Sequence, residues 1–189
     1  MSISPTLAEA LIWQANGCRA LGSPFTGGLL DRAAAGELGP LDDLFEAWRD
    51  GDLAIHLRAA TPLRLAGALH HLVLTGAAPA LAARYPEAHP ETNWPALIAA
   101  ARTAMDERRA AIAAFMISPP QTNEVGRSFC LAPGFMQIAA RFGLPLRLFE
   151  IGSSAGLNLR WDRYAYDFGG QAWGDPASPV LIANGWRGA

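Results

Sequence analysis

Apolar residues recur along most of the chain, up to about residue 143, with the spacing of one face of an α-helix. Prolines mark four of the expected helix starts. Ser4, Ser23 and Thr61 each place a capping hydroxyl directly before a proline, whereas Trp94 precedes a proline without such a cap. The pattern predicts helices over residues 5–21, 24–35, 40–48, 62–75, 95–117 and 124–141.

The pattern becomes that of a strand after Gly143. Residues 146–151 (LRLFEI) are an apolar run of strand length, and residues 152–156 (GSSAG) are small enough for the backbone to turn sharply and for a ligand to approach. A helix is expected over residues 157–166 and a second strand over residues 179–183, with a connection rich in glycine and proline between them. The predicted secondary structure therefore changes near residue 143, from helices alone to strands and a helix.

The composition narrows the classes of function. Hydrophobic residues make up 51% of the 189 positions and charged residues only 17%, which excludes a disordered tail. All 15 basic residues are arginine, so no lysine Schiff base and no PLP-type covalent chemistry can occur within this chain. A net charge of -2 without a basic tract argues against binding to nucleic acid or to an anionic membrane, which leaves a small-molecule ligand as the default.

Cysteine use and the N-terminus indicate a cytoplasmic protein. Cys18 and Cys130 are single and far apart, so neither a zinc-type cluster nor a disulfide framework is expected. Residues 1–5 (MSISP) lack the charged and apolar regions of a leader, and no segment has 18 uninterrupted apolar residues.

The loop after the predicted strand carries the strongest candidate site. Residues 150–156 (EIGSSAG) follow an acidic-x-Gly-x-small-x-Gly pattern, and a loop between a strand and a helix points free N–H groups and the positive end of a helix dipole at one place. This pattern resembles the first motif of class I S-adenosylmethionine-dependent methyltransferases. An ordinary strand-to-helix turn is the alternative, and the two have similar weight.

The resemblance implies roles for individual residues. In that family the backbone of the loop wraps the methionine part of the cofactor, and the leading carboxylate helps to hold its amino group. Ser154 stands where the family usually has its middle glycine. The cofactor-binding residues implied for S-adenosylmethionine are Glu150, Gly152, Ser153, Ser154, Gly156 and Asn158.

The same residues also fit the Gly-x-Ser-x-Gly pattern of a hydrolase nucleophile elbow. On that interpretation Ser154 would attack an ester and the N–H of Ala155 would help to form an oxyanion hole. Hydrolases of this kind place the histidine after the serine, whereas all four histidines of this chain precede it. A serine hydrolase is therefore ranked below a methyltransferase.

A polar run of residues, 121–127 (QTNEVGR), lies between two apolar helices. As a helix start it would use Asn123 as the cap and place Glu124 in the favourable first turn. Capping does not need so many polar groups, so we favour a site that faces the glycine-rich loop, in which Arg127 or Asn123 binds a carboxylate or an orienting group of the ligand. Its candidate residues are Gln121, Asn123, Glu124 and Arg127.

Other polar or aromatic groups are weaker candidates. His70 and His71 point about 100° apart on a helix, so packing is favoured over a shared metal site. Residues 106–109 (DERR) are expected on the solvated face of the long helix, and residues 161–164 (WDRY) in a core or at a pocket mouth. No metal site is predicted.

The chain as a whole resembles the uncharacterised bacterial family called domain of unknown function 2332. The resemblance rests on residues 121–127, on residues 148–159 (LFEIGSSAGLNL) with 162–164 (DRY), and on residues 173–180 (WGDPASPV). It implies a helical N-terminal region joined to a methyltransferase-like domain, and members longer than this chain. The fold class expected is thus a mostly α N-terminal domain (residues 1–143) followed by the start of a truncated Rossmann-type α/β sheet (residues 144–189).

Two features depart from the methyltransferase pattern. The acidic residue that usually holds the cofactor's ribose follows roughly 20 residues on, whereas Asp167 comes only 11 positions after Gly156 and the predicted second strand ends near Asn184. The chain also stops at Ala189, just after that strand. We therefore expect the front part of a longer protein, or a fragment whose open sheet edge self-associates.

Two functions from different classes remain open. The first is a methyltransferase-like protein of unknown substrate, whose helical domain covers the opening of the sheet. The second is a non-catalytic remnant of the fold that acts as an interaction or regulatory module. Occlusion of the loop by Ile151 or Trp161 would favour the second.

Overall fold

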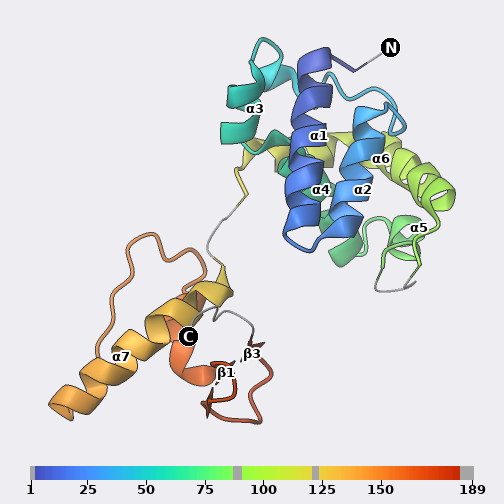
Figure 1. Ribbon diagram of the computed structural model, residues 1–189. Helices are drawn as coiled ribbons and strands as arrows, with labels where there is room; N and C mark the ends of the chain where they lie inside the picture. The colour runs from blue at the N-terminus through green and yellow to red at the C-terminus, as the bar shows by residue number, and fades with distance from the viewer. Residues whose placement is uncertain (1–2, 87–90, 121–123, 184–189) are drawn as a thin grey trace. The chain divides into compact units, whose positions relative to one another are not determined.

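A computed structural model describes residues 3–86, 91–120 and 124–183 (Figure 1). The chain forms two compact units, Met1–Pro120 and Gln121–Ala189. The sequence-based boundary at residue 143 grouped the last helix with the first unit, whereas the structure groups it with the second.

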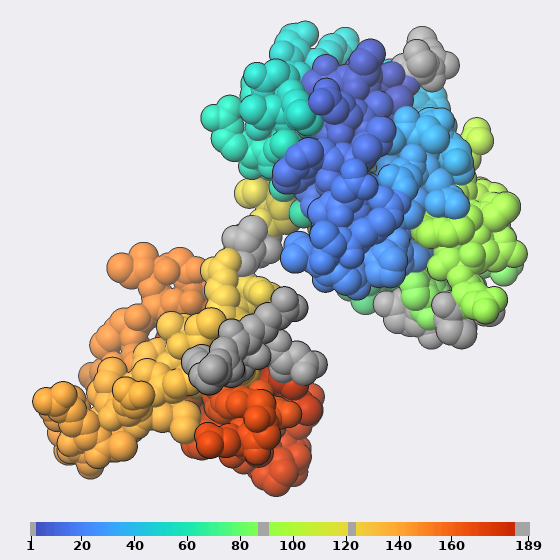
Figure 2. Space-filling view, viewed as in Figure 1, coloured from blue at the N-terminus to red at the C-terminus, as the bar shows by residue number. Residues whose placement is uncertain are grey.

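The first unit is helical. Its helices α1 and α2 pack side by side (Figures 1 and 2), and α4 packs against α6. The elements are α1 (Pro5–Ala20), α2 (Pro24–Ala34), η1 (Glu46–Trp48), α3 (Leu53–Arg58), α4 (Thr61–Leu74), α5 (Pro79–Ala82) and α6 (Trp94–Ile117). The predictions of α1, α2, α4 and α6 are confirmed to within one or two residues at each end, whereas the short helices α3 and α5 were missed.

The helix starts differ in detail from those expected. The Oγ of Ser4 accepts a hydrogen bond from the N–H of Leu7 (3.2 Å), which confirms it as a cap. Thr61 lies inside α4 instead of capping it. The expectation that α6 lacks a cap is wrong, because the Oδ1 of Asn93 accepts a bond from the N–H of Ala96 (3.2 Å).

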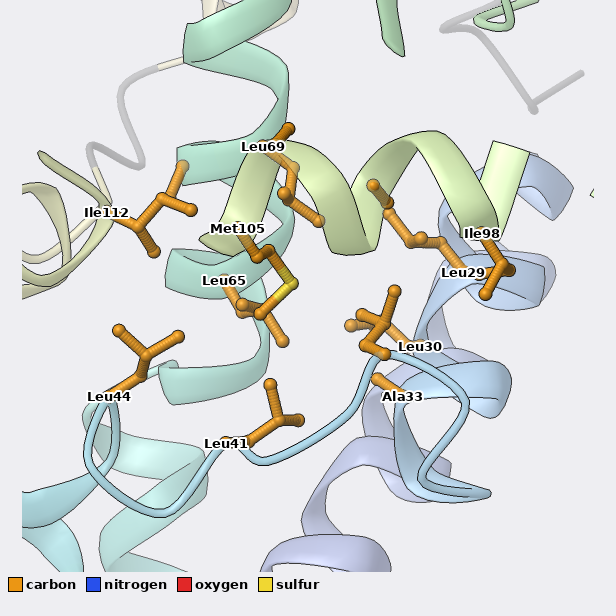
Figure 3. Packing of buried hydrophobic residues seen from close by; sticks show 14 of the residues in the cluster. Leu29, Leu30, Ala33, Leu41, Leu44, Leu65, Leu69, Ile98, Met105 and Ile112 are labelled. Atoms are coloured by element: carbon orange, nitrogen blue, oxygen red, sulfur yellow. The ribbon is translucent and has the colours of Figure 1, made fainter. Parts of the chain in front are cut away.

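The predicted helix over residues 40–48 is wrong, because the structure has turns there and only the short 3-10 helix η1. Leu41 and Leu44 are nevertheless buried in the main core, where they project toward the side chains of α4 and α6 (Figure 3). Arg109 of α6 holds this segment, since its Nη2 donates to the carbonyl of Pro40 (2.6 Å) and its Nε to Asp43 (2.6 Å). The apolar spacing thus predicted correctly that these leucines are buried, but it predicted the wrong backbone conformation.

The second unit contains one long helix and a small sheet (Figure 1). Strand β1 lies in the middle, antiparallel to β2 with Tyr166 opposite Trp173, and parallel to β3 with Tyr166 opposite Ile182. Its elements are η2 (Val125–Arg127), α7 (Ser128–Phe142), η3 (Leu157–Arg163), β1 (Ala165–Asp167), β2 (Ala172–Trp173) and β3 (Leu181–Ile182).

A small aromatic core joins α7 to this sheet. Phe129 and Ala132 of α7 are buried against Tyr164 and Tyr166. Burial raises the pKa of the Tyr166 phenol, which therefore stays neutral and donates a hydrogen bond to the carbonyl of Trp161 (2.9 Å). Through this core α7 contacts η3, the element that directly follows the glycine-rich loop.

The described residues form a small mixed sheet of three strands, and the predicted start of a Rossmann-type sheet is not confirmed. Residues 146–151 have no strand assignment, because none of the described segments provides a ladder of hydrogen bonds beside them. The helix expected over residues 157–166 is the 3-10 helix η3, and the chain then enters β1. Only the predicted second strand has a counterpart, the two-residue β3.

Candidate functional site

The loop over residues 152–156 has an unusual backbone. Gly152, Ser154 and Gly156 have φ angles of 71°, 52° and 70°, and the N–H of Gly156 donates to the carbonyl of Ser153 (2.8 Å). Positive φ suits glycine, but it is uncommon for a serine and is seen most often at turns and functional sites. The loop is therefore tightly turned at three alternate positions.

The loop is also open. A Cβ atom added at Gly152 or at Gly156 would have no neighbouring heavy atom within 4 Å. Ile151 is fully exposed, and Trp161 packs against the rings of Phe135 (5.2 Å) and Trp173 (5.3 Å). Neither of the two side chains expected to occlude a non-catalytic loop does so. These glycines therefore serve the backbone conformation and leave space for a ligand.

Glu150 and Asn158, predicted as two members of the cofactor site, lie together at the base of the loop. The Nδ2 of Asn158 donates a long hydrogen bond to the Oε1 of Glu150 (3.5 Å), and Asn158 is only 5% exposed. The second carboxylate oxygen, Oε2 of Glu150, is buried and has no hydrogen-bond partner among the described residues. A buried carboxylate oxygen without a donor is costly, so this atom is suited to receive a hydrogen bond from a bound molecule.

The N–H groups of Ser154 and Ala155 supply donors at the same loop. Neither forms a hydrogen bond to any residue that the structure describes. The dipole of a following α-helix was expected to assist them, but η3 is a 3-10 helix of seven residues. The loop therefore offers a buried acceptor and backbone donors, without a helix dipole.

The polar run before α7 is only partly described. Gln121 and Asn123 lie outside the described residues. Glu124 and Arg127 are exposed, and the Glu124 carboxylate folds over Gly126. The helix predicted to begin just after residue 123 starts as η2 and becomes α7 only at Ser128, whose Oγ donates to the carbonyl of Val125 (2.7 Å).

The η2 turn of this segment contacts η3, the element that follows the candidate loop. That the polar run faces the loop itself stays a prediction. A ligand contact by Gln121, Asn123, Glu124 or Arg127 stays a prediction.

The second unit does not contain the partners of a serine nucleophile. None of the four histidines lies in residues 121–189, and Ser154 forms no hydrogen bond with a described residue. Within this unit, the loop therefore lacks the histidine that usually activates a serine nucleophile.

Sequence reasoning missed two arginines close to the loop. Arg160 and Arg163 of η3 line a groove of about 740 Å³ that begins at Ala155 and Gly156. The available signal was a pair of arginines three positions apart in the sequence, although the backbone of η3 is kinked at Arg160.

The other sequence candidates have structural roles. His70 stacks on Tyr85 (5.6 Å) and His71 lies beside Phe115 (5.0 Å), so each histidine packs on a different ring. Arg109, expected on a solvated face, instead pairs with Asp43 and holds the pKa of that carboxyl below its usual value. The described part of the chain has no group of three or more potential metal ligands.

Comparisons with known proteins identify a family but no activity. None of the described helices is both long and apolar enough to cross a membrane. No curated protein and no solved structure matches the chain. A family model described as "Uncharacterized protein conserved in bacteria (DUF2332)" matches residues 8–189. The chain therefore belongs to the DUF2332 family of uncharacterised bacterial proteins.

Proposed function

We propose that this protein binds S-adenosylmethionine at the loop over residues 152–156 and is a methyltransferase-like protein. The observation that carries the proposal is the buried Oε2 of Glu150, which lacks a hydrogen-bond partner among the described residues and lies at the base of this open loop. An ammonium group is the strongest donor for such an oxygen.

Each part of the loop has a place in cofactor binding. Glu150 would accept from the amino group of the methionine part, and Asn158 would hold the carboxylate in position through the bond to Oε1. The N–H groups of Ser154 and Ala155 would donate to the cofactor's carboxylate. Gly152 and Gly156 would supply the turned backbone, because their φ angles are those that glycine adopts without strain.

Methyl transfer makes modest demands on the protein. The cofactor brings the activated methyl group and the acceptor brings the nucleophile, so positioning and electrostatic complementarity supply most of the catalysis. The absence of a histidine from residues 121–189 is therefore compatible with this chemistry.

A non-catalytic interaction module is the second candidate, and the exposed apolar side chains before the loop favour it. Phe149 and Ile151 are 86% and 103% exposed on a segment without strand partners in the described part of the chain. Such a segment can add to a sheet edge of another molecule. Self-association through this segment or the outer strands would give a dimer by light scattering, and a monomer at all concentrations would contradict it.

The proposed function is tested by calorimetric titration of S-adenosylmethionine and S-adenosylhomocysteine. Glu150→Gln keeps the side-chain shape and removes the charge, while Gly152→Val places a branched side chain at a φ of 71° and narrows the loop. Both changes should weaken binding by about tenfold or more.

Gly134→Val is the matched control. It adds the same side chain to the same unit, on α7, where a Cβ also has no neighbour within 4 Å. This variant should bind as the unmodified chain does. Absence of saturable binding to the unmodified chain would leave the interaction module as the better account.

A further inference from the structure

The groove beside the loop has two walls of different origin. One wall is the end of the loop with η3, and the other is the segment that leads into β3. Its volume of about 740 Å³ falls in the usual range of small-molecule sites. The lining residues used below are Arg160, Arg163, Asp175, Leu157, Pro179 and Val180.

Hydrogen bonds fix the two walls to each other. The Oγ of Ser178 donates to the carbonyl of Arg163 (2.8 Å), and the N–H of Ala165 donates to the carbonyl of Val180 (2.9 Å). In the segment that leads into β3, the Oδ1 of Asp175 accepts a hydrogen bond from the N–H of Ala177 (2.8 Å), which stabilises a turn there. The groove is thus built by the fold of this unit.

The charge of the groove is not balanced by the protein. Arg160 and Arg163 are exposed, and neither forms an ion pair with a residue that the structure describes. The acidic side chain in the lining is Asp175, and one of its oxygens is already bonded to the backbone. Two guanidinium groups against one carboxylate leave a net positive site, and guanidinium groups bind carboxylates and phosphates with two parallel hydrogen bonds.

Much of the remaining lining is apolar. Leu157, Pro179 and Val180 border the same groove, so a bound molecule would meet hydrocarbon surface beside the arginines. A simple inorganic anion would leave that surface uncovered, whereas an aromatic or aliphatic body would bury it.

We infer that this groove binds a small organic anion, in which a carboxylate or phosphate group is attached to an apolar body. Because the groove begins at Ala155 and Gly156, this anion would be the methyl acceptor if the loop holds the cofactor. Only the role of the anion as methyl acceptor rests on the proposed function. The binding of the anion itself does not.

The test uses three probes that share a phenyl ring: phenyl phosphate, benzoate and neutral benzyl alcohol, each titrated into the full chain at constant ionic strength. Phenyl phosphate or benzoate should bind saturably, and whichever binds more tightly identifies the anionic group. Benzyl alcohol should bind at least about tenfold more weakly, because it cannot pair with the guanidinium groups. Inorganic phosphate should also bind more weakly than phenyl phosphate.

The double variant Arg160→Gln/Arg163→Gln should weaken the binding of the anions by about tenfold or more. The double variant Arg141→Gln/Arg147→Gln is the control, because it removes the same two charges from exposed positions of the same unit outside the groove. Equal weakening in both proteins would show attraction by general charge and overturn the inference, as would no binding of either anion by the unmodified chain.

The outcome is separable from that of the proposed function. Cofactor binding without anion binding would overturn this inference alone. Anion binding without cofactor binding would support the groove as an anion site and contradict the proposed methyltransferase-like function.

Discussion

Arg64 of α4 is predicted to be a main determinant of the stability of the first unit. It is 7% exposed and has no carboxylate partner among the described residues. Its Nη1 instead donates to the carbonyls of Met116 (2.8 Å) and Ile117 (2.7 Å) at the end of α6, and its Nε to the carbonyl of Ala59 (2.7 Å), the C-cap of α3. One guanidinium therefore satisfies carbonyls that helix ends leave without partners.

The perturbation is Arg64→Met, which keeps much of the side-chain volume and removes the donors. Three charge-assisted bonds are lost, each worth roughly 1.5–3 kcal/mol, but the cost of burying the charge is recovered. We estimate a net loss of about 3 kcal/mol in the free energy of unfolding. For a unit spanning Met1–Pro120, this corresponds to a fall in Tm of about 12 °C.

The assay is urea unfolding followed by far-UV circular dichroism, because helices of the first unit dominate that signal. The control is Arg102→Met, the same change at an exposed position of α6, which should cost no more than about 0.5 kcal/mol. A loss below about 1 kcal/mol for Arg64→Met, or one equal to that of the control, would show that the bonds of Arg64 to the helix ends do not stabilise this unit.

Two further changes test the fold. At Gly174, where φ is 94° and a Cβ would collide with the carbonyl of Tyr164, alanine should destabilise the second unit by at least about 2 kcal/mol. Hydrogen exchange of the Ala165 N–H measures this loss. Gly170→Ala is the control, because its φ is 99° but an added Cβ has no neighbour within 4 Å, so it should cost only the backbone strain of a positive φ. His56 is 2% exposed, and burial lowers its pKa. The unfolded chain therefore binds a proton more readily, so the free energy of unfolding should fall as pH drops below about 6.5. Urea unfolding at several pH values should show that the free energy of unfolding depends less on pH in His56→Gln than in the unmodified chain. An equal pH dependence in the two proteins would contradict this assignment.

The helical unit was largely predictable because its signals are local. Prolines at helix starts and apolar spacing locate α1, α2, α4 and α6. The segment with Leu41 and Leu44 was mistaken for a helix because apolar spacing reports burial, whereas the backbone there is held by Arg109 from a distant part of the chain.

The second unit was less predictable because strands depend on partners. The apolar residues 146–151 have strand character, but their sequence contains no information on which segment would pair with them. The pairing of β1 with β3 joins residues on either side of a turn-rich connection.

The candidate site was predictable in part. The loop pattern pointed to Glu150 and Asn158, and the structure brings these two side chains together. Arg160 and Arg163 were missed because an exposed arginine on a short helix is ordinarily a solvated residue, and only the fold shows the groove that they line.

The most direct test of the cofactor proposal is a two-dimensional ¹H–¹⁵N spectrum of the 189-residue chain during titration with S-adenosylhomocysteine. If the loop binds the cofactor, we expect saturable shifts for the amides of Gly152, Ser154, Ala155 and Gly156 and for the Asn158 side-chain amide, and their loss in Glu150→Gln. Saturable shifts confined to other residues, or no shifts at millimolar ligand, would contradict the claim that this loop is a cofactor site.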